Sequence, residues 1–292
     1  MNVSERIVEI LEEEGISDVF GIPGEQIMPL YRALSDSKIN HVLTRHEQVA
    51  AHAGDGYARS SGKIGVCIAT ASPGALNTTM ALATAYKDNV PLLVLTGDNE
   101  LKFRGTDHFQ STPQVEIFKH ITRQSYNPLN GTEAIFMLKA SIYELKNFPK
   151  GPIHINLSKD VLLQEDFEDI DLCYLCEEDM SKLNDAQDLI DKSQRPLFIL
   201  GAGAIDESER ISRIVEKYQI PVTTTYHAKG AVSEDNPLNL GLSGLRATDR
   251  GRYAFENADC IIALGIKASE RTLPYVPDNL IHVNINKDVL IG

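Results

Sequence analysis

Three neighbouring stretches decide the fold: FGIPGEQ at 20–26, TRHEQVAAHAGDGYARSSG at 44–62 and GVCIATASPGALN at 65–77. Apolar, strand-like runs alternate here with helix-forming segments, and the connections between them are short. The same alternation continues to about residue 160 and resumes near residue 195. Continuous apolar runs are typical of strands that are covered on both faces. The sequence therefore predicts an α/β protein with two doubly wound domains and mostly parallel sheets.

Glu47 stands at the junction between an expected strand at 41–43 and an expected helix at 46–60. In an open parallel sheet such junctions lie along the carboxyl edge, where ligands bind. The helix macrodipole alone also explains a carboxylate in a first turn. However, Pro23-Gly24 and Pro73-Gly74 stand at neighbouring strand ends, and such turns can direct backbone amides toward a ligand. We therefore predict a cofactor site with Glu47 as its proton acceptor.

Two further segments are assigned to this site. Asn77 falls in the first turn of an expected helix at 74–87, where it can cap the helix or contact the ligand. Phe109 and Gln110 lie in a loop that follows an expected strand at 91–96. Polar and aromatic groups on a loop favour contact with substrate, although Phe109 can equally fill a small core.

The charge of the chain excludes some classes of partner. The 292 residues carry a formal net charge of −13 and have no long basic run. A nucleic-acid groove requires clustered Lys and Arg, so that class is disfavoured. No apolar run approaches the ~20 residues of a membrane span. The N-terminal segment is acidic and amphipathic, unlike a signal peptide. We expect a cytoplasmic protein that binds neither nucleic acid nor membrane.

A series of segments occurs in a fixed order along the chain: RHEQ…AHAGDGYAR, GVCIAT…PGALN, PLLVLTGD, GTDHFQ, GPIHINLSKDV, IPVTTT and ADCIIALG. In this order they resemble the large catalytic subunit of acetolactate synthase, within the thiamine-diphosphate enzymes. The resemblance implies a pyrimidine-binding domain at 1–165, a linker at 166–185 and a Rossmann-like middle domain at 186–292. The family's third domain, which binds diphosphate through Mg²⁺, is not within these residues.

The resemblance also implies a role for individual residues. Glu47 corresponds to the glutamate that hydrogen-bonds N1′ of the aminopyrimidine of thiamine diphosphate. The implied reaction decarboxylates pyruvate and condenses the product with a second 2-oxo acid. Phe109 and Gln110 match the substrate-side loop. The expected cofactor-binding residues are Pro23, Gly24, Glu47, Pro73, Gly74 and Asn77 in the first domain, and Gly201, Gly203, Gly244 and Gly265 in the second.

Several positions depart from the family pattern. Glu25 and Ser72 stand where glycine is usual, and Arg246-Ala247 replaces a His-Gly pair. Asn284 and Asn286 stand where acidic residues are expected, which removes acceptors for ribose hydroxyls. The middle domain is therefore expected to hold FAD, another adenine nucleotide, or nothing.

Two other motifs are interpreted as structural. Gly54-Asp55-Gly56 resembles the family's magnesium–diphosphate motif, but it lies inside the expected helix 46–60 and not after a buried strand. His46 and His52 do not have a same-face helical spacing, and no acidic partner completes a metal set. No metal ligand is therefore predicted in this chain.

The cysteines are also interpreted as structural. Cys67 and Cys260 stand in apolar runs, where a buried and unreactive thiol is expected. Cys173 and Cys176 have acidic neighbours and no second pair of ligands, so this CxxC is interpreted as incidental.

The missing third domain leads to a final expectation. Mg²⁺ is expected only together with that domain, and residues 1–292 alone are not expected to bind the cofactor tightly or turn over. The resemblance predicts a homodimer or higher oligomer through the pyrimidine-binding domain, or a partner chain that carries the diphosphate domain. Two alternatives stay open: a decarboxylase of another 2-oxo acid, and a non-catalytic homologue that senses a nucleotide.

Overall fold

The computed structural model describes residues 1–147, 149–170, 182–269, 271–284 and 290. The chain separates into two compact units, residues 1–174 and 175–292. The predicted linker 166–185 contains this boundary and lies partly outside the described residues. No helix in the described part combines the length and apolar character needed to cross a membrane.

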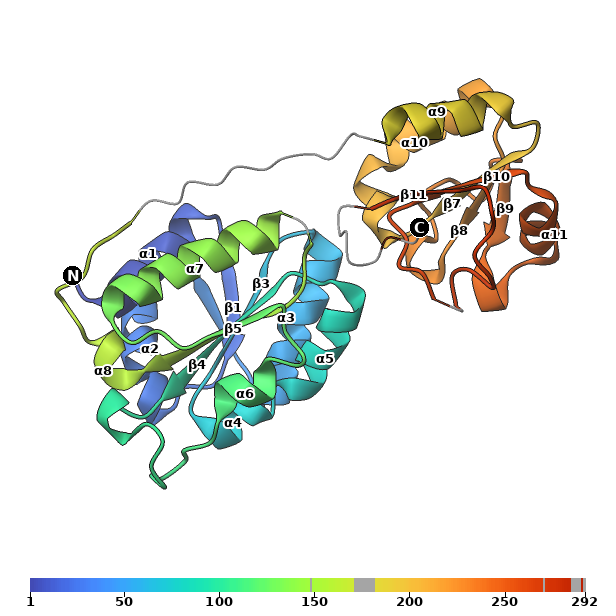
Figure 1. The fold of residues 1–292 in the computed structure, drawn as a ribbon. Coiled ribbons are helices and arrows are strands. Elements are labelled where there is room, and N and C mark those ends of the chain that lie inside the picture. Colours follow the sequence, from blue (N-terminus) through green and yellow to red (C-terminus); the bar gives the residue numbers. More distant parts are fainter. Residues whose placement is uncertain (148, 171–181, 270, 285–289, 291–292) are drawn as a thin grey trace. The chain divides into compact units, whose positions relative to one another are not determined.

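The first unit alternates strands and helices (Figure 1). Its elements are α1 (Val3–Glu13), β1 (Asp18–Gly21), the 3-10 helix η1 (Glu25–Ile27), α2 (Met28–Ser35), β2 (Asn40–Leu43), α3 (Glu47–Ser61), β3 (Gly65–Ala69), α4 (Ser72–Leu76), α5 (Thr79–Asp88), β4 (Leu92–Asp98), η2 (Leu101–Phe103), α6 (Gln114–Phe118), β5 (Gln124–Tyr126), α7 (Gly131–Lys146), β6 (Ile153–Ser158) and α8 (Lys159–Leu162).

These strands form a six-stranded sheet in the order β2-β1-β3-β4-β6-β5, and every pairing is parallel. Parallel strands require crossover connections, which place helices on both faces. One core cluster packs α1, α2 and α7 against one face of the sheet. A second cluster, rich in alanine, packs α3 and α5 against the other face.

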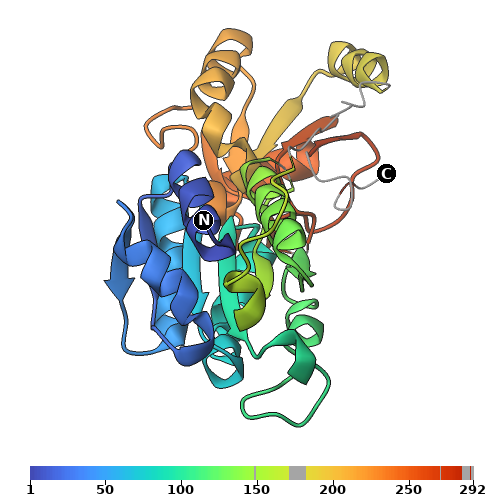
Figure 2. The ribbon, with the colours of Figure 1, turned by 90° about the vertical axis from the view of Figure 1, so that its left-hand side faces the viewer.

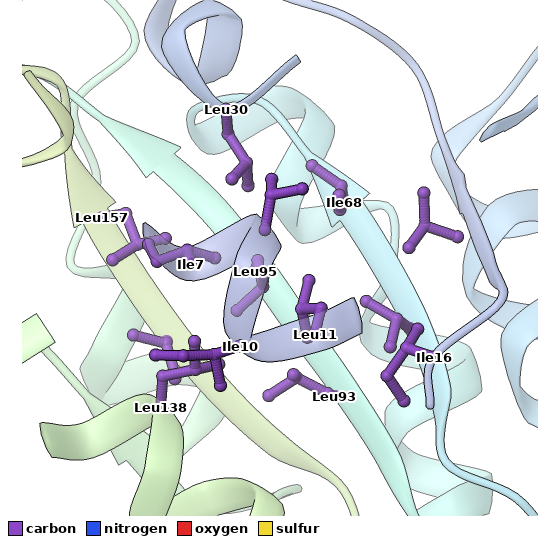
Figure 3. Close-up of a cluster of buried hydrophobic side chains, with 14 of the residues drawn as sticks. Ile7, Ile10, Leu11, Ile16, Leu30, Ile68, Leu93, Leu95, Leu138 and Leu157 are labelled. Atoms are coloured by element: carbon purple, nitrogen blue, oxygen red, sulfur yellow. The ribbon is translucent and has the colours of Figure 1, made fainter. Parts of the chain in front are cut away.

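Figure 3 shows the first cluster, where Ile7, Ile10 and Leu11 of α1 meet Leu93 and Leu95 of β4. All five side chains are nearly or fully buried. Their spacing in α1 follows the helical period, so one face of the helix is apolar. Burying such side chains contributes roughly 1.5–3 kcal/mol each and fixes the sheet on which the site is built.

The second unit is a smaller α/β domain with a parallel five-stranded sheet in the order β11-β10-β7-β8-β9. Its elements are α9 (Leu183–Lys192), β7 (Pro196–Leu200), η3 (Ala202–Glu207), α10 (Ser208–Tyr218), β8 (Val222–Thr224), η4 (Tyr226–Ala228), β9 (Asn239–Leu242), η5 (Gly244–Arg246), α11 (Asp249–Asn257), β10 (Cys260–Leu264) and β11 (Leu280–Val283). The predicted fold of two doubly wound, mostly parallel α/β domains is therefore confirmed.

One predicted helix was wrong, and local hydrogen bonding gives the reason. The expected helix 74–87 is two helices, α4 and α5, which are separated at Asn77 and Thr78. The Thr78 hydroxyl donates to the carbonyl of Ala75 at 2.7 Å. Such local side-chain bonds compete with the regular helical pattern. The short strands β5 and β9 were not predicted, since few apolar residues mark them.

Candidate functional site

The strand order places three predicted segments side by side. Pro23-Gly24 follows β1, Glu47 follows β2, and Pro73-Gly74 follows β3. Because β2, β1 and β3 are neighbours in the sheet, these segments share its carboxyl edge. This edge is where parallel sheets bind ligands.

Glu47 is the first residue of α3, and the local sequence explains why the helix begins there. The backbone of His46 is extended, and its Nδ1 accepts a hydrogen bond from the backbone N–H of Gln48 at 3.1 Å. His46 is thus the N-cap of α3. The carboxylate of Glu47 is half-buried at the positive end of the helix dipole.

Asn77 holds the carboxylate of Glu47. Its Nδ2 donates to Oε2 of Glu47 at 2.9 Å, across a sequence separation of 30 residues. The break between α4 and α5 frees Asn77 for this contact. Hydrogen bonds to a charged acceptor are stronger than neutral ones, so the amide fixes the orientation of the carboxylate.

Gly24 and Gly74 both lie against Thr70, the residue that follows β3. A Cβ on Gly24 would be 2.4 Å from Thr70 Cβ, and one on Gly74 would be 2.9 Å from Thr70 Cγ2. The Gly74 Cβ would also be 3.0 Å from Oε1 of Glu47. Gly74 therefore keeps the space beside the carboxylate free of a side chain, and Gly24 allows its backbone to lie close to Thr70. Oγ1 of Thr70 is buried and has no hydrogen-bond partner among the described residues.

The charge of Glu47 acts on two buried groups beneath it. Burial is the main cause of a raised pKa for both Tyr31 and Cys67, and the negative charge of Glu47 raises both further. Both groups therefore stay neutral. Glu47 is thus accompanied by two buried groups that carry no charge.

Phe109 and Gln110 lie in the loop between β4 and α6, which projects from the first unit in both views (Figures 1 and 2). The side chain of Phe109 is 76% exposed, so it does not fill a core. A hydrogen bond between Ser72 and Thr112 ties the end of this loop to the start of α4. The loop therefore reaches the same edge of the sheet as Pro73-Gly74.

Two models of the same family match this chain. The first is described as "Thiamine pyrophosphate enzyme, N-terminal TPP binding domain" and matches residues 1–117. The second is described as "Thiamine pyrophosphate enzyme, central domain" and matches residues 183–291. Together they cover most of the chain. The chain belongs to the thiamine pyrophosphate enzymes.

Curated relatives carry more specific names. A "Probable acetolactate synthase large subunit" of Methanocaldococcus jannaschii is 38% identical over 98% of this chain and 51% of the relative. "Acetolactate synthase 1, chloroplastic" of Zea mays is 35% identical over 96% of this chain and 46% of the relative. The chain thus spans about half the length of the curated relatives that it matches.

The first unit, which matches the model described as a TPP binding domain, offers polar atoms and free space at this edge. Glu47 presents an oriented carboxylate oxygen, and Gly74 leaves room beside it. The orphaned hydroxyl of Thr70 adds a polar atom at the same edge. The sequence reasoning missed Thr70, although a polar residue between an apolar strand and a Pro-Gly turn was a usable signal.

The glycines of the second unit serve close backbone packing. A Cβ on Gly201 would be 2.2 Å from the carbonyl oxygen of Gly265, and one on Gly244 would be 1.9 Å from that of Arg271. The N–H of Gly203 donates to the Gly265 carbonyl at 3.1 Å, and that of Gly201 to Leu264 at 2.8 Å.

These two amides are thus occupied and are not available to a phosphate group. Asn284 uses its amide to donate to the carbonyl of Ile266 at 2.6 Å. Asn286 lies outside the described residues. The predicted FAD or adenine nucleotide therefore gains no support from these contacts.

The motif Gly54-Asp55-Gly56 lies within α3, as predicted. Asp55 pairs with Arg59 at 2.9 Å, and Arg59 also pairs with Asp88 of α5 at 2.9 Å. These contacts join α3 to α5 and give the motif a structural role. No cluster of His, Cys, Asp and Glu suited to a metal occurs among the described residues.

The cysteines fall into two groups. Cys67 and Cys260 are buried, as predicted, and burial raises the pKa of both thiols. Cys173 and Cys176 lie outside the described residues.

Proposed function

We propose that this chain supplies the pyrimidine-binding and central domains of an acetolactate-synthase-like enzyme that depends on thiamine diphosphate. The proposed reaction decarboxylates pyruvate and condenses the product with a second 2-oxo acid. The observation that carries the proposal is the carboxylate of Glu47, held by Asn77 beside Gly74. The relatives named acetolactate synthase support the choice of reaction.

In this proposal Glu47 shares a proton with N1′ of the aminopyrimidine. When bound, the cofactor supplies the centre that stabilises the carbanion formed on decarboxylation. Asn77 orients the carboxylate, and Tyr31 and Cys67 stay neutral. Phe109 and Gln110 face the 2-oxo acid from their loop.

The diphosphate and its Mg²⁺ are proposed to bind to a domain outside residues 1–292, because the matched family models describe the N-terminal and central domains. Exposed apolar side chains on β2, α3 and α5 support a protein partner for this domain. Leu43 of β2, Val49 of α3 and Met80 of α5 expose 66%, 55% and 61% of their surface. We propose that a second copy of the pyrimidine-binding domain, or the chain that carries the diphosphate domain, covers these side chains.

The test compares Glu47→Gln with Glu116→Gln in enzyme assembled with a diphosphate-binding domain. Glu116 is also a first-turn glutamate, in α6, so it controls for the helix dipole. We expect Glu47→Gln to lower kcat by about 10²–10⁴-fold, the usual range for a group that transfers protons. Full activity of Glu47→Gln would refute the assignment of Glu47.

Calorimetry tests the proposed division between domains. Residues 1–292 are titrated with thiamine diphosphate and Mg²⁺, first alone and then with the diphosphate-binding domain. We expect tight binding only in the second case. Tight binding by residues 1–292 alone would refute the proposal that the diphosphate and its Mg²⁺ bind to a domain outside these residues.

Glu25 favours one alternative, a decarboxylase of another 2-oxo acid. Its carboxylate follows Gly24 directly and pairs with Lys159 at 3.3 Å. It therefore adds an ion pair next to Gly24 of the proposed site. Analysis of the products from pyruvate alone separates the alternatives, since acetolactate forms only in the condensation.

A further inference from the structure

The loop between β4 and α6 has a backbone that needs support. Gln110 has φ of 59°, in the left-handed region, which a residue with a side chain rarely adopts. Phe109 beside it is largely exposed, so packing does not hold it. Such a conformation persists only where surrounding contacts determine it.

Hydrogen bonds hold the loop at two places. Asn99 is nearly buried, and its Nδ2 donates to the carbonyl of Phe109 at 3.0 Å. Nη2 of Arg104 donates to Oδ1 of Asn127 at 2.7 Å and to the hydroxyl of Ser158 at 3.2 Å. These contacts anchor the loop to the ends of β4, β5 and β6.

The side chain of Asn156 of β6, which is 2% exposed, connects these two sets of hydrogen bonds. Its Nδ2 donates to Oδ2 of Asp98 at 2.7 Å and to Oδ1 of Asn127 at 3.2 Å. The other oxygen of Asp98 accepts the backbone N–H of Asn99 at 2.8 Å. An amide supplies both donors here, whereas a carboxylate would offer only acceptors and repel Asp98.

A buried histidine fixes the orientation of this amide. The Thr96 hydroxyl donates to Oδ1 of Asn156 at 3.2 Å. It is also 2.8 Å from Nε2 of His154, while Nδ1 of His154 is 2.8 Å from the hydroxyl of Ser125. We assign the Thr96 proton to Oδ1 of Asn156, which can only accept, so in this tautomer Nε2 of His154 donates to Thr96. Burial lowers the pKa of His154 to about 3, so the ring stays neutral.

We propose that Asn156 is a positioning residue that holds the loop carrying Phe109 and Gln110, and thereby sets the selectivity of the site between 2-oxo acids of different size. This inference rests on the proposed function. The donors run in one direction, from Ser125 through His154 and Thr96 to Asn156, and end on Asp98. When all donors in a buried hydrogen-bond network point the same way and every donor and acceptor has a partner, the network favours one arrangement of its side chains.

The first test needs no activity. Hydrogen exchange is measured for the amides of Thr106 and Ser111, which donate within the loop to the carbonyls of Phe103 and His108. We expect Asn156→Asp and Asn99→Ala to speed their exchange by about 10-fold, since one hydrogen bond of ordinary strength is lost. Asn130→Ala removes the N-cap of α7 and is the matched control, with unchanged exchange in the loop.

The second test measures kcat/KM of the assembled enzyme for pyruvate and for a larger 2-oxo acid. We expect the ratio of the two values to change by about 5-fold or more in Asn156→Asp and Asn99→Ala, as it does when the shape of a pocket changes. Unchanged loop exchange in both variants overturns the inference, and so does faster exchange with an unchanged ratio. Failure of the proposed function appears separately, as full activity of Glu47→Gln.

Discussion

Replacing Gly74 with alanine tests whether the space beside Glu47 serves the carboxylate. The new Cβ would be 2.9 Å from Cγ2 of Thr70 and 3.0 Å from Oε1 of Glu47. Thr70 is β-branched and cannot easily turn away. Glu47 is half-buried and can move, so we expect its carboxylate to give way.

The expected magnitudes separate activity from stability. To reach ordinary contact, the Glu47 oxygen must retreat by roughly 0.5 Å. This movement weakens the 2.9 Å hydrogen bond from Asn77. Because misplacement by ~1 Å can cost about 100-fold in rate, we expect a loss of on the order of 10- to 100-fold in kcat. Alanine gains about 1 kcal/mol of helix propensity, and crowding costs about 1–3 kcal/mol, so the net destabilisation is about 0–2 kcal/mol.

The assay measures kcat of the assembled enzyme and the urea unfolding of residues 1–292. Gly56→Ala is the matched control, since a Cβ on Gly56 in α3 would meet nothing within 4 Å. It should keep full activity and gain about 1 kcal/mol of stability. If Gly74→Ala folds and keeps its kcat within a factor of about two, the role of Gly74 in positioning Glu47 is refuted.

Three predictions concern stability, each measured by urea unfolding of residues 1–292. Gly65→Ala should lose at least about 2 kcal/mol, because its Cβ would be 2.1 Å from a backbone oxygen of α3; a loss below ~0.5 kcal/mol would contradict this close approach. The free energy of unfolding should fall by about 2 kcal/mol when the pH is lowered from 7 to 5, and His154 should cause this loss. In the unfolded chain the ring takes up a proton below its ordinary pKa of 6.5, whereas in the folded chain its pKa is about 3 and it stays neutral. A variant His154→Gln should lack this component, and an identical pH dependence would refute it. Arg59→Met should cost about 1–3 kcal/mol, because it leaves Asp55, which is nearly buried, without its partner while Asp88 stays solvated; no loss would show that the pair is not stabilising.

The sequence by itself determined the α/β class, the parallel strands and a helix with Glu47 in its first turn, predicted from residue 46 and observed from Glu47. These features depend on local patterns, namely apolar runs, capping residues and turns, which act over a few residues. The same local reasoning placed Gly54-Asp55-Gly56 inside a helix and excluded it as a diphosphate motif. Its failure at the helix expected over 74–87 has a local cause, since the hydroxyl of Thr78 donates to the carbonyl of Ala75 and competes with the helical pattern.

Only the tertiary structure decided which distant groups meet at the site. The contact of Asn77 with Glu47 and the position of Thr70 under two glycines depend on β2, β1 and β3 being neighbours. The support of Phe109 by Asn99, and of the whole loop by Asn156, depends likewise on the order of β4, β6 and β5. Strand order is fixed by the packing of helices on both faces of the sheet, which no short stretch of sequence encodes. The sequence therefore identified the carboxylate, and the packed sheet selected the side chains that orient it.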